Sequence, residues 1–162
     1  MRTMTSKPAK TADALSWHES FRAVPDTVPD VRARVRCEVR KWGYSDVVVD
    51  DAELVVAELA SNAVIHGCNG ADGQFDVFLA ARPDGLEVAV GDPSSQLPTR
   101  VETAEDDVHG RGLILVHALS AQWKALVGPG GGKRIWALIA AESLPGVQPS
   151  TQVGPGIEVI SC

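Results

Sequence analysis

Apolar residues in the first half of the chain recur with the period of an α-helix. They stand three or four positions apart at Val28, Val31, Val35, Val39 and Trp42. This spacing predicts a helix that follows Pro25 and ends at Gly43, because glycine is favoured just beyond the last turn of a helix. A second, more apolar helix is predicted to begin at Ser45 or Asp46 and to stop near Gly67.

Much of the remaining chain alternates apolar and polar residues in short runs, which is typical of half-buried strands. The runs lie at 15–23, 75–79, 86–90, 123–127 and 135–139. Proline and glycine in Arg82-Pro83-Asp84-Gly85 suit a type I turn, so the second and third runs are predicted to form a hairpin. A short apolar helix is predicted over 112–119.

The length of 162 residues suits one domain with a sizeable core. We expect a disordered lead at 1–14, a folded domain at 15–141 and a disordered tail at 142–162, where proline, glycine, serine and glutamine dominate. The net charge of −6 disfavours a general nucleic-acid surface. The three cysteines are scattered, and neither a signal sequence nor an apolar span of membrane length is evident, so we expect a cytoplasmic protein.

A polar stripe interrupts the apolar second helix. Glu58, Asn62 and His66 stand four residues apart and therefore share one helix face. Polar groups buried in this way need partners, and a ligand is one such partner. A carboxylate and a carboxamide oxygen one turn apart suit hydrated Mg²⁺, which prefers oxygen ligands and retains water. The alternative is an ordinary amphipathic helix with a solvated face.

Three further segments contain residues suited to ligand binding: Asp92-Pro93-Ser94, Gly110-Arg111-Gly112-Leu113 and Gly131-Gly132-Lys133. None completes one of the common nucleotide motifs. A P-loop needs a glycine where Val127 stands and a serine or threonine where Arg134 stands. A dinucleotide-binding fingerprint needs a third glycine after Gly112.

Together with the polar stripe, these segments resemble the ATPase domain that histidine kinases share with DNA gyrase, a heat-shock chaperone and MutL, known as the GHKL or Bergerat-type domain. Glu58 to Gly67 is similar to its N box, E-L-x-x-N-A-x-x-H-G, Asp92 to its adenine-binding aspartate, and Gly110 to Leu113 to its G-x-G-L box. The predicted domain most resembles the small regulatory branch that contains the anti-sigma-factor serine kinases. The resemblance implies a two-layer α/β sandwich, with helices on one face of a mixed, largely antiparallel sheet.

The resemblance also implies a role for each residue. Asn62 would hold Mg²⁺ through its side-chain oxygen, and Glu58 would be the general base that deprotonates the attacking hydroxyl. Asp92 would accept a hydrogen bond from the exocyclic amine of adenine and so select ATP over GTP. The other expected nucleotide contacts are His66, Ser94, Leu97, Gly110, Arg111, Gly112, Leu113 and Lys133. Of these, Arg111 and Lys133 are candidate charge partners of the triphosphate, and solvent exposure is the alternative for both.

The implied function is that of an anti-sigma-factor-like protein serine/threonine kinase that uses ATP and Mg²⁺. Its expected partner is an anti-anti-sigma protein of the STAS type, a sigma factor, or both. The resemblance also allows a homodimer, and no direct contact with nucleic acid or membrane is expected. The alternative is a nucleotide-gated module that sequesters a partner without catalysis. The two glycines that follow the aspartate in the wider family are absent here, which favours the module, whereas Glu58 favours the enzyme.

Two other features leave alternatives open. The segment 93–110 has no periodicity and lies between two ligand motifs, so we expect it to form a lid over the nucleotide. The first predicted helix carries Arg32, Arg36 and Arg40 on the side opposite its valines. These arginines form either a solvated face or a contact surface for an acidic partner, while the acidic chain disfavours a DNA-binding helix.

Overall fold

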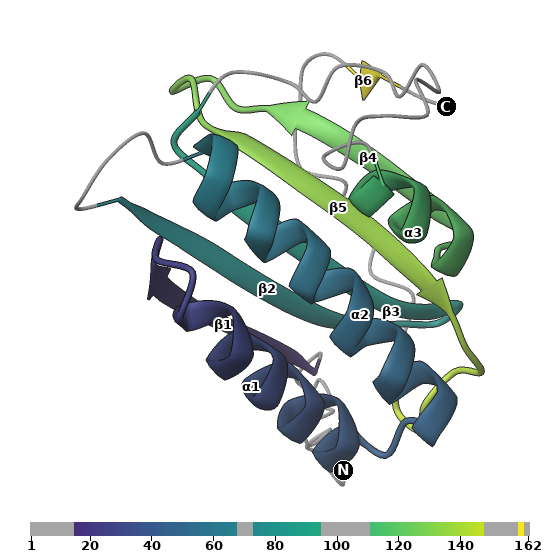
Figure 1. Ribbon diagram of the computed structural model, residues 1–162. Coiled ribbons are helices and arrows are strands. Elements are labelled where there is room, and N and C mark those ends of the chain that lie inside the picture. The colour runs from purple at the N-terminus through teal and green to yellow at the C-terminus, as the bar shows by residue number, and fades with distance from the viewer. Residues whose placement is uncertain (1–14, 68–72, 95–110, 148–158, 161–162) are drawn as a thin grey trace, which may run out of the picture.

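A computed structural model describes residues 15–67, 73–94, 111–147 and 159–160, with two long helices lying over one face of a sheet (Figure 1). The helices are α1 (Thr27–Trp42), α2 (Asp46–Asn62) and α3 (Arg111–Leu119), and a π-helical turn, η1 (Ala63–Gly67), follows α2. The strands are β1 (Ser16–Arg22), β2 (Gln74–Arg82), β3 (Gly85–Asp92), β4 (Gln122–Val127), β5 (Lys133–Ala140) and β6 (Val159–Ile160). The expected two-layer α/β sandwich is confirmed.

The sheet has the strand order β1-β2-β3-β5-β4-β6. Every pairing between the described strands is antiparallel, so none of them supplies the parallel pair that a mixed sheet would contain. Because β5 lies between β3 and β4, two strands that are distant in sequence become neighbours. This pairing sets the end of β3 beside the start of β5, where Asp92 stands opposite Lys133.

The core lies between the sheet and the helices α1 and α2. Val31, Val35 and Val39, the predicted apolar face of α1, are completely buried. The sheet contributes the buried side chains of Phe75, Val77, Leu79, Leu86, Val88 and Ile139. Truncating one of the larger side chains of such a core to alanine typically costs about 2–5 kcal/mol. The core therefore fixes α2, and the polar stripe at its end, against the sheet.

The ends of the two long helices follow the signals in the sequence. Gly43 ends α1 with a φ of 93°, a left-handed conformation that glycine adopts without strain. Ser45 caps α2 by accepting a hydrogen bond from the backbone N–H of Val48 at 3.4 Å. Between them, the Tyr44 hydroxyl donates to the carbonyl oxygen of Gly85 at 2.8 Å. The connection between the helices is thereby attached to the start of β3.

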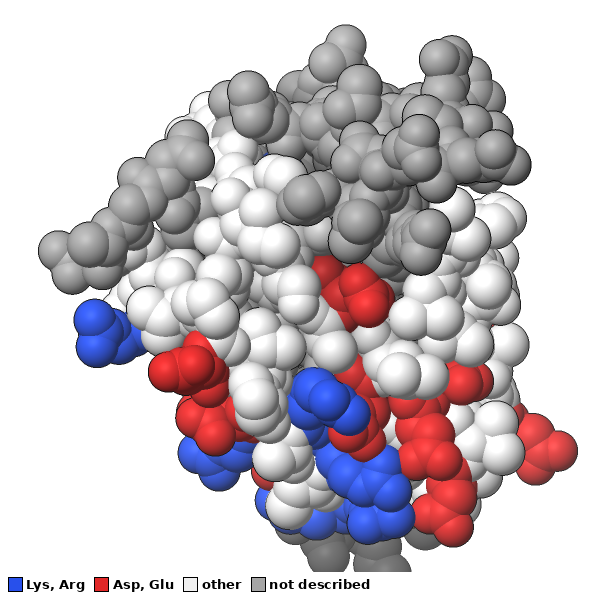
Figure 2. Space-filling model, viewed as in Figure 1, with Lys and Arg blue, Asp and Glu red and all other residues white. Residues whose placement is uncertain are grey.

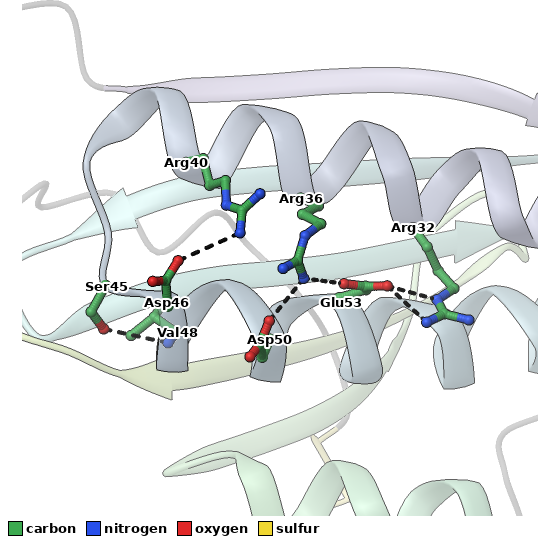
Figure 3. Close-up of polar contacts among 8 residues, drawn as sticks. All are labelled: Arg32, Arg36, Arg40, Ser45, Asp46, Val48, Asp50 and Glu53. Atoms are coloured by element: carbon green, nitrogen blue, oxygen red, sulfur yellow. Dashed lines mark hydrogen bonds and ion pairs between the residues drawn. The ribbon is translucent and has the colours of Figure 1, made fainter.

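The arginines on the outer side of α1 face acidic side chains of α2. Figure 2 shows basic and acidic side chains next to one another across these two helices. Figure 3 shows the contacts of this arginine ladder: Arg32 with Glu53, Arg36 with Glu53 and Asp50, and Arg40 with Asp46. The ladder joins α1 to the first half of α2, from Asp46 to Glu53.

Electrostatics within the ladder favour the charged forms of its members. Burial acts to raise the pKa of Glu53, but hydrogen bonds from Arg36 and Arg32 outweigh it and leave that pKa below its ordinary value. Hydrogen bonds to Asp50 and Glu53 raise the pKa of Arg36. Carboxylates of the same chain thus balance the positive charge of these arginines. The hypothesis that they form a contact surface for an acidic partner therefore loses its main support.

The last described strand, β6, lies in the segment that we expected to be disordered. It pairs with β4, with Ile160 opposite Ala125. The limits of the domain remain a prediction. Among the helices of the described residues, none is both long enough and apolar enough to cross a lipid bilayer.

Candidate functional site

The polar stripe of α2 is partly accessible to solvent. Glu58 and Asn62 are both half-buried, and His66 is exposed. Within the described ranges, the structure records no hydrogen bond or ion pair for Glu58 or Asn62. Two polar side chains one turn apart on the same helix face, without partners in the described protein, are available to bind a ligand.

The last turn of the second predicted helix differs from the expectation. The α-helix ends at Asn62, and the turn Ala63–Gly67 is π-helical. Turns of this kind are rare in proteins overall, and those that occur often lie at functional sites. A Cβ atom at Gly67 would stand only 2.3 Å from Cγ of Asp92. Glycine therefore allows η1 to approach the end of β3, and the N box meets the aspartate motif at this point.

Asp92 is the last residue of β3, and it is buried. Its Oδ1 accepts a hydrogen bond from the backbone N–H of Ser94 at 2.9 Å. Its Oδ2 lies 3.5 Å from Nζ of Lys133. A Cβ atom at Gly132 would come within 3.1 Å of the carbonyl oxygen of Asp92. Asp92 is thus enclosed by η1, by the backbone at Ser94 and by the start of β5.

The environment of Asp92 works against its charge. Burial raises the pKa of Asp92 above its ordinary value, while the ammonium of Lys133 and the N–H of Ser94 lower it to a smaller extent. An ionised carboxylate in this place therefore carries a cost in free energy. A titratable group whose pKa is shifted by burial, and which lies beside a specific opposite charge, is a candidate functional-site residue.

Lys133 has a different neighbour from the one that the sequence suggested. We expected its ammonium beside the triphosphate or in solvent, but its side chain is buried and pairs with Asp92. Because Asp92 is the residue expected to contact adenine, Lys133 lies at the adenine end of the predicted site.

The other expected contacts are described only in part. Ser94 contacts Asp92 through its backbone, and Leu113 is buried in α3, which packs against α2. Leu97, Gly110, the side chain of Arg111 and nearly all of the predicted lid lie outside the described residues. Arg111 and Gly112 are the first residues of α3.

Sequence reasoning missed the pair formed by Asp92 and Lys133 and the close approach of Gly67. Both depend on contacts between segments that are far apart in the chain. One signal was available, since Asp92 lies two residues after one predicted strand and Lys133 two residues before another. Antiparallel pairing of those two strands would place the residues opposite each other, but the sequence does not state which strands pair.

The described residues hold no cluster of three or more histidine, cysteine, aspartate or glutamate side chains that could hold a metal ion. The Mg²⁺ implied by the resemblance does not require such a cluster, because Mg²⁺ keeps several waters and is usually held by one or two protein ligands plus phosphate oxygens. The carboxamide of Asn62 fits that role, since it is half-buried and has no recorded partner in the described part of the chain.

Comparison with known proteins agrees with the fold. Residues 21–137, most of the chain, match the family model described as "Histidine kinase-like ATPase domain". The chain is also similar to the crystal structure of the RsbU and RsbW domains of Rv1364c from Mycobacterium tuberculosis, with a TM-score of 0.58 and 23% identity over 80% of this chain. The chain spans 34% of the length of that structure's chain, and a likeness at this identity concerns the fold alone. No curated protein sequence matches the chain.

Proposed function

We propose, because the chain belongs to the histidine kinase-like ATPase domain family, that it is an ATP-dependent protein serine/threonine kinase of the anti-sigma-factor type. Its substrate would be a serine of an anti-anti-sigma partner of the STAS type. One observation carries the proposal: Glu58 and Asn62 are half-buried and unpartnered in the described chain on one face of α2, and η1 links that face to the buried Asp92. A cytoplasmic location and a homodimer remain predictions.

The adenine and the phosphates of ATP each have candidate partners in the chain. Asp92 would accept a hydrogen bond from the exocyclic amine of adenine, where guanine has a carbonyl group. Asn62 would hold Mg²⁺, which neutralises the charge of the phosphates when it is bound. The N-terminus of α3 offers backbone N–H groups that suit phosphate oxygens.

Glu58 would act as the general base of the transfer. In this reaction the hydroxyl oxygen of the acceptor serine attacks the γ-phosphorus of ATP. The bond from that phosphorus to the bridging oxygen breaks, ADP leaves with the electron pair, and the serine proton passes to the Glu58 carboxylate. A docked partner would exclude water and favour transfer over hydrolysis.

The variant Glu58→Gln tests this proposal, because an amide keeps the shape of the side chain and cannot accept the proton. Transfer of labelled phosphate from Mg-ATP to a purified STAS-type partner should fall about 10²–10⁴-fold, with ATP binding retained. Asp51→Asn is the matched control, since Asp51 is also a half-buried carboxylate of α2 without a recorded partner in the described ranges. It should leave the rate unchanged. Transfer by Glu58→Gln at the wild-type rate would refute the base assignment.

A second candidate function is the nucleotide-gated module that sequesters its partner without catalysis. The sequence after Asp92 favours it, since the two glycines of the wider family are missing there. The same assay separates the two candidates. A wild-type protein that binds its partner with Mg-ATP and leaves it unphosphorylated would establish the module.

A further inference from the structure

Asp92 and Lys133 are the charged residues that the structure buries within its described ranges, and they are neighbours. Their side chains are 3% and 4% exposed, respectively. They stand opposite each other in the antiparallel register, where β3 ends and β5 begins. Lysine is almost never buried to this degree without a partner, so the surroundings of its ammonium group decide its role.

The pair leaves the ammonium of Lys133 short of hydrogen-bond acceptors. An ammonium group has three N–H donors, and Oδ2 of Asp92 is its one recorded partner in the described chain. The separation of 3.5 Å is also long for a charge-assisted hydrogen bond, which normally measures about 2.7–2.9 Å. Moving such a group out of water without replacing its hydrogen bonds is costly. The unused donors therefore point to an acceptor on a ligand.

The carboxylate of Asp92 has complementary capacity. An ionised carboxylate offers about four acceptor positions, and here the N–H of Ser94 uses Oδ1 while the ammonium of Lys133 uses Oδ2. Gly67 brings no side chain between η1 and this carboxylate. The two buried groups therefore present an acceptor and a donor side by side.

We propose that Lys133 is a second base-specificity residue, which donates a hydrogen bond to ring nitrogen N1 of adenine while Asp92 accepts one from the adjacent exocyclic amine. This inference rests on the proposed function, because it concerns the same nucleotide site. The amine and N1 are neighbouring positions on the adenine edge, and they require one acceptor and one donor. Guanine in the same pose would set a carbonyl against the carboxylate and an N–H against the ammonium, so both residues would reject it.

Two ATP analogues test the inference on the unmodified protein. In one, carbon replaces N1 of adenine; in the other, carbon replaces N7, which lies away from this edge. Affinities are measured by isothermal titration calorimetry with Mg²⁺ present. The wild type should bind the N1 analogue about 10–100-fold more weakly than ATP, as expected for the loss of one hydrogen bond to a charged donor. The N7 analogue should bind like ATP.

Variants of Lys133 assign that effect to its ammonium. Lys133→Met, which has a similar length and no donor, should bind ATP and the N1 analogue equally. Lys133→Gln keeps an N–H donor and should restore part of the discrimination. If Lys133 only neutralised Asp92, Lys133→Met would weaken both ligands by one factor and keep the wild-type ratio between them, which would overturn the inference.

The outcomes also separate this inference from the proposed function. Wild-type protein that binds ATP and the N1 analogue equally well would overturn the role of Lys133 alone. Wild-type protein that binds no ATP would overturn both proposals. Because these two results come from measurements without any substitution, they do not depend on whether the Lys133 variants fold.

Discussion

At the scale of single residues, the pair formed by Asp92 and Lys133 has opposing consequences for stability and for binding. Taking two charges out of water is expensive, and their attraction offsets that cost only when the geometry is good and the remaining hydrogen bonds are satisfied. Here the contact is 3.5 Å long, and the ammonium has one recorded partner in the described chain. We infer that the pair contributes little to the stability of the nucleotide-free protein, in keeping with the ligand-binding role proposed for it.

This interpretation predicts a specific pattern of stabilities. Asp92→Leu or Lys133→Met alone should lower the free energy of unfolding by about 3–5 kcal/mol, because each leaves the other group buried and unpaired. The double variant should be as stable as the wild type, or more stable by about 1–4 kcal/mol. Urea unfolding followed by tryptophan fluorescence measures all four proteins. A double variant less stable than both single variants would contradict the interpretation.

The pKa direction of Asp92 adds a pH dependence to the same prediction. Burial raises this pKa in the folded protein, so the folded state binds the proton more tightly than the unfolded chain, whose aspartates have a pKa of about 3.9. The contribution of Asp92 to stability is therefore fully present below about pH 4 and is lost as the pH rises through the folded-state pKa. Lys133→Met removes the ammonium that partly offsets the cost of an ionised, buried Asp92. The variant's loss of unfolding free energy relative to the wild type should therefore shrink as the pH is lowered from about 7 to about 4, where Asp92 becomes protonated.

At the scale of elements, periodicity predicted the helices and strands because most of these elements bury one face and expose the other. The spacing of Val31, Val35 and Val39 gave the buried face of α1, and Gly43 gave its end. The β2–β3 hairpin was also predictable, because its turn residues and its alternating pattern are close together in the sequence. Features that depend on neighbouring residues could therefore be predicted from the sequence.

The features that escaped prediction depend on contacts across the fold. The arginines of α1 gave no sign that α2 would supply their counter-ions. Apolar residues continue through Val64, so the pattern did not mark the change from α-helix to π-helix after Asn62. The candidate site depends on this turn and on the pairing of β3 with β5, and so its residues could be named while their arrangement could not.

The π-helical turn yields a prediction about Gly67. In Gly67→Ala the added Cβ would overlap the Asp92 carboxylate, so either η1 or that side chain must move. We expect the affinity for ATP to fall about 10–100-fold, as for the loss of a hydrogen bond to a charged group. Calorimetric titration with Mg-ATP measures the change. Gly130→Ala is the control, because a Cβ there would meet no atom within 4 Å and should leave the affinity unchanged. Wild-type affinity in Gly67→Ala would remove Asp92 from the site.

At the scale of the whole molecule, three elements converge on the candidate site from separate parts of the fold. The end of α2 with η1 carries Glu58 and Asn62, β3 ends in Asp92, and β5 begins with Lys133. The core holds the strands, and the arginine ladder together with the core holds α2 (Figures 1 and 3). A site supported in this way on regular elements keeps its geometry better than a site on loops. Family membership implies a nucleotide as the ligand, and the proposed site lies where these elements meet.

Binding at such a site should stabilise the entire domain. A ligand that binds only the folded state adds about 2.7 kcal/mol at a hundredfold excess over its dissociation constant. For a chain of this size we expect Mg-ATP to raise the melting temperature by about 5–10 °C. Asn62→Ala should lose the part of the shift that depends on Mg²⁺, with the shift in ATP plus a chelator as the internal control. Differential scanning calorimetry with ATP and with GTP completes the test. An equal shift with GTP would contradict the adenine-selective role of Asp92, and an unchanged Mg²⁺-dependent shift in Asn62→Ala would remove that residue as the metal ligand.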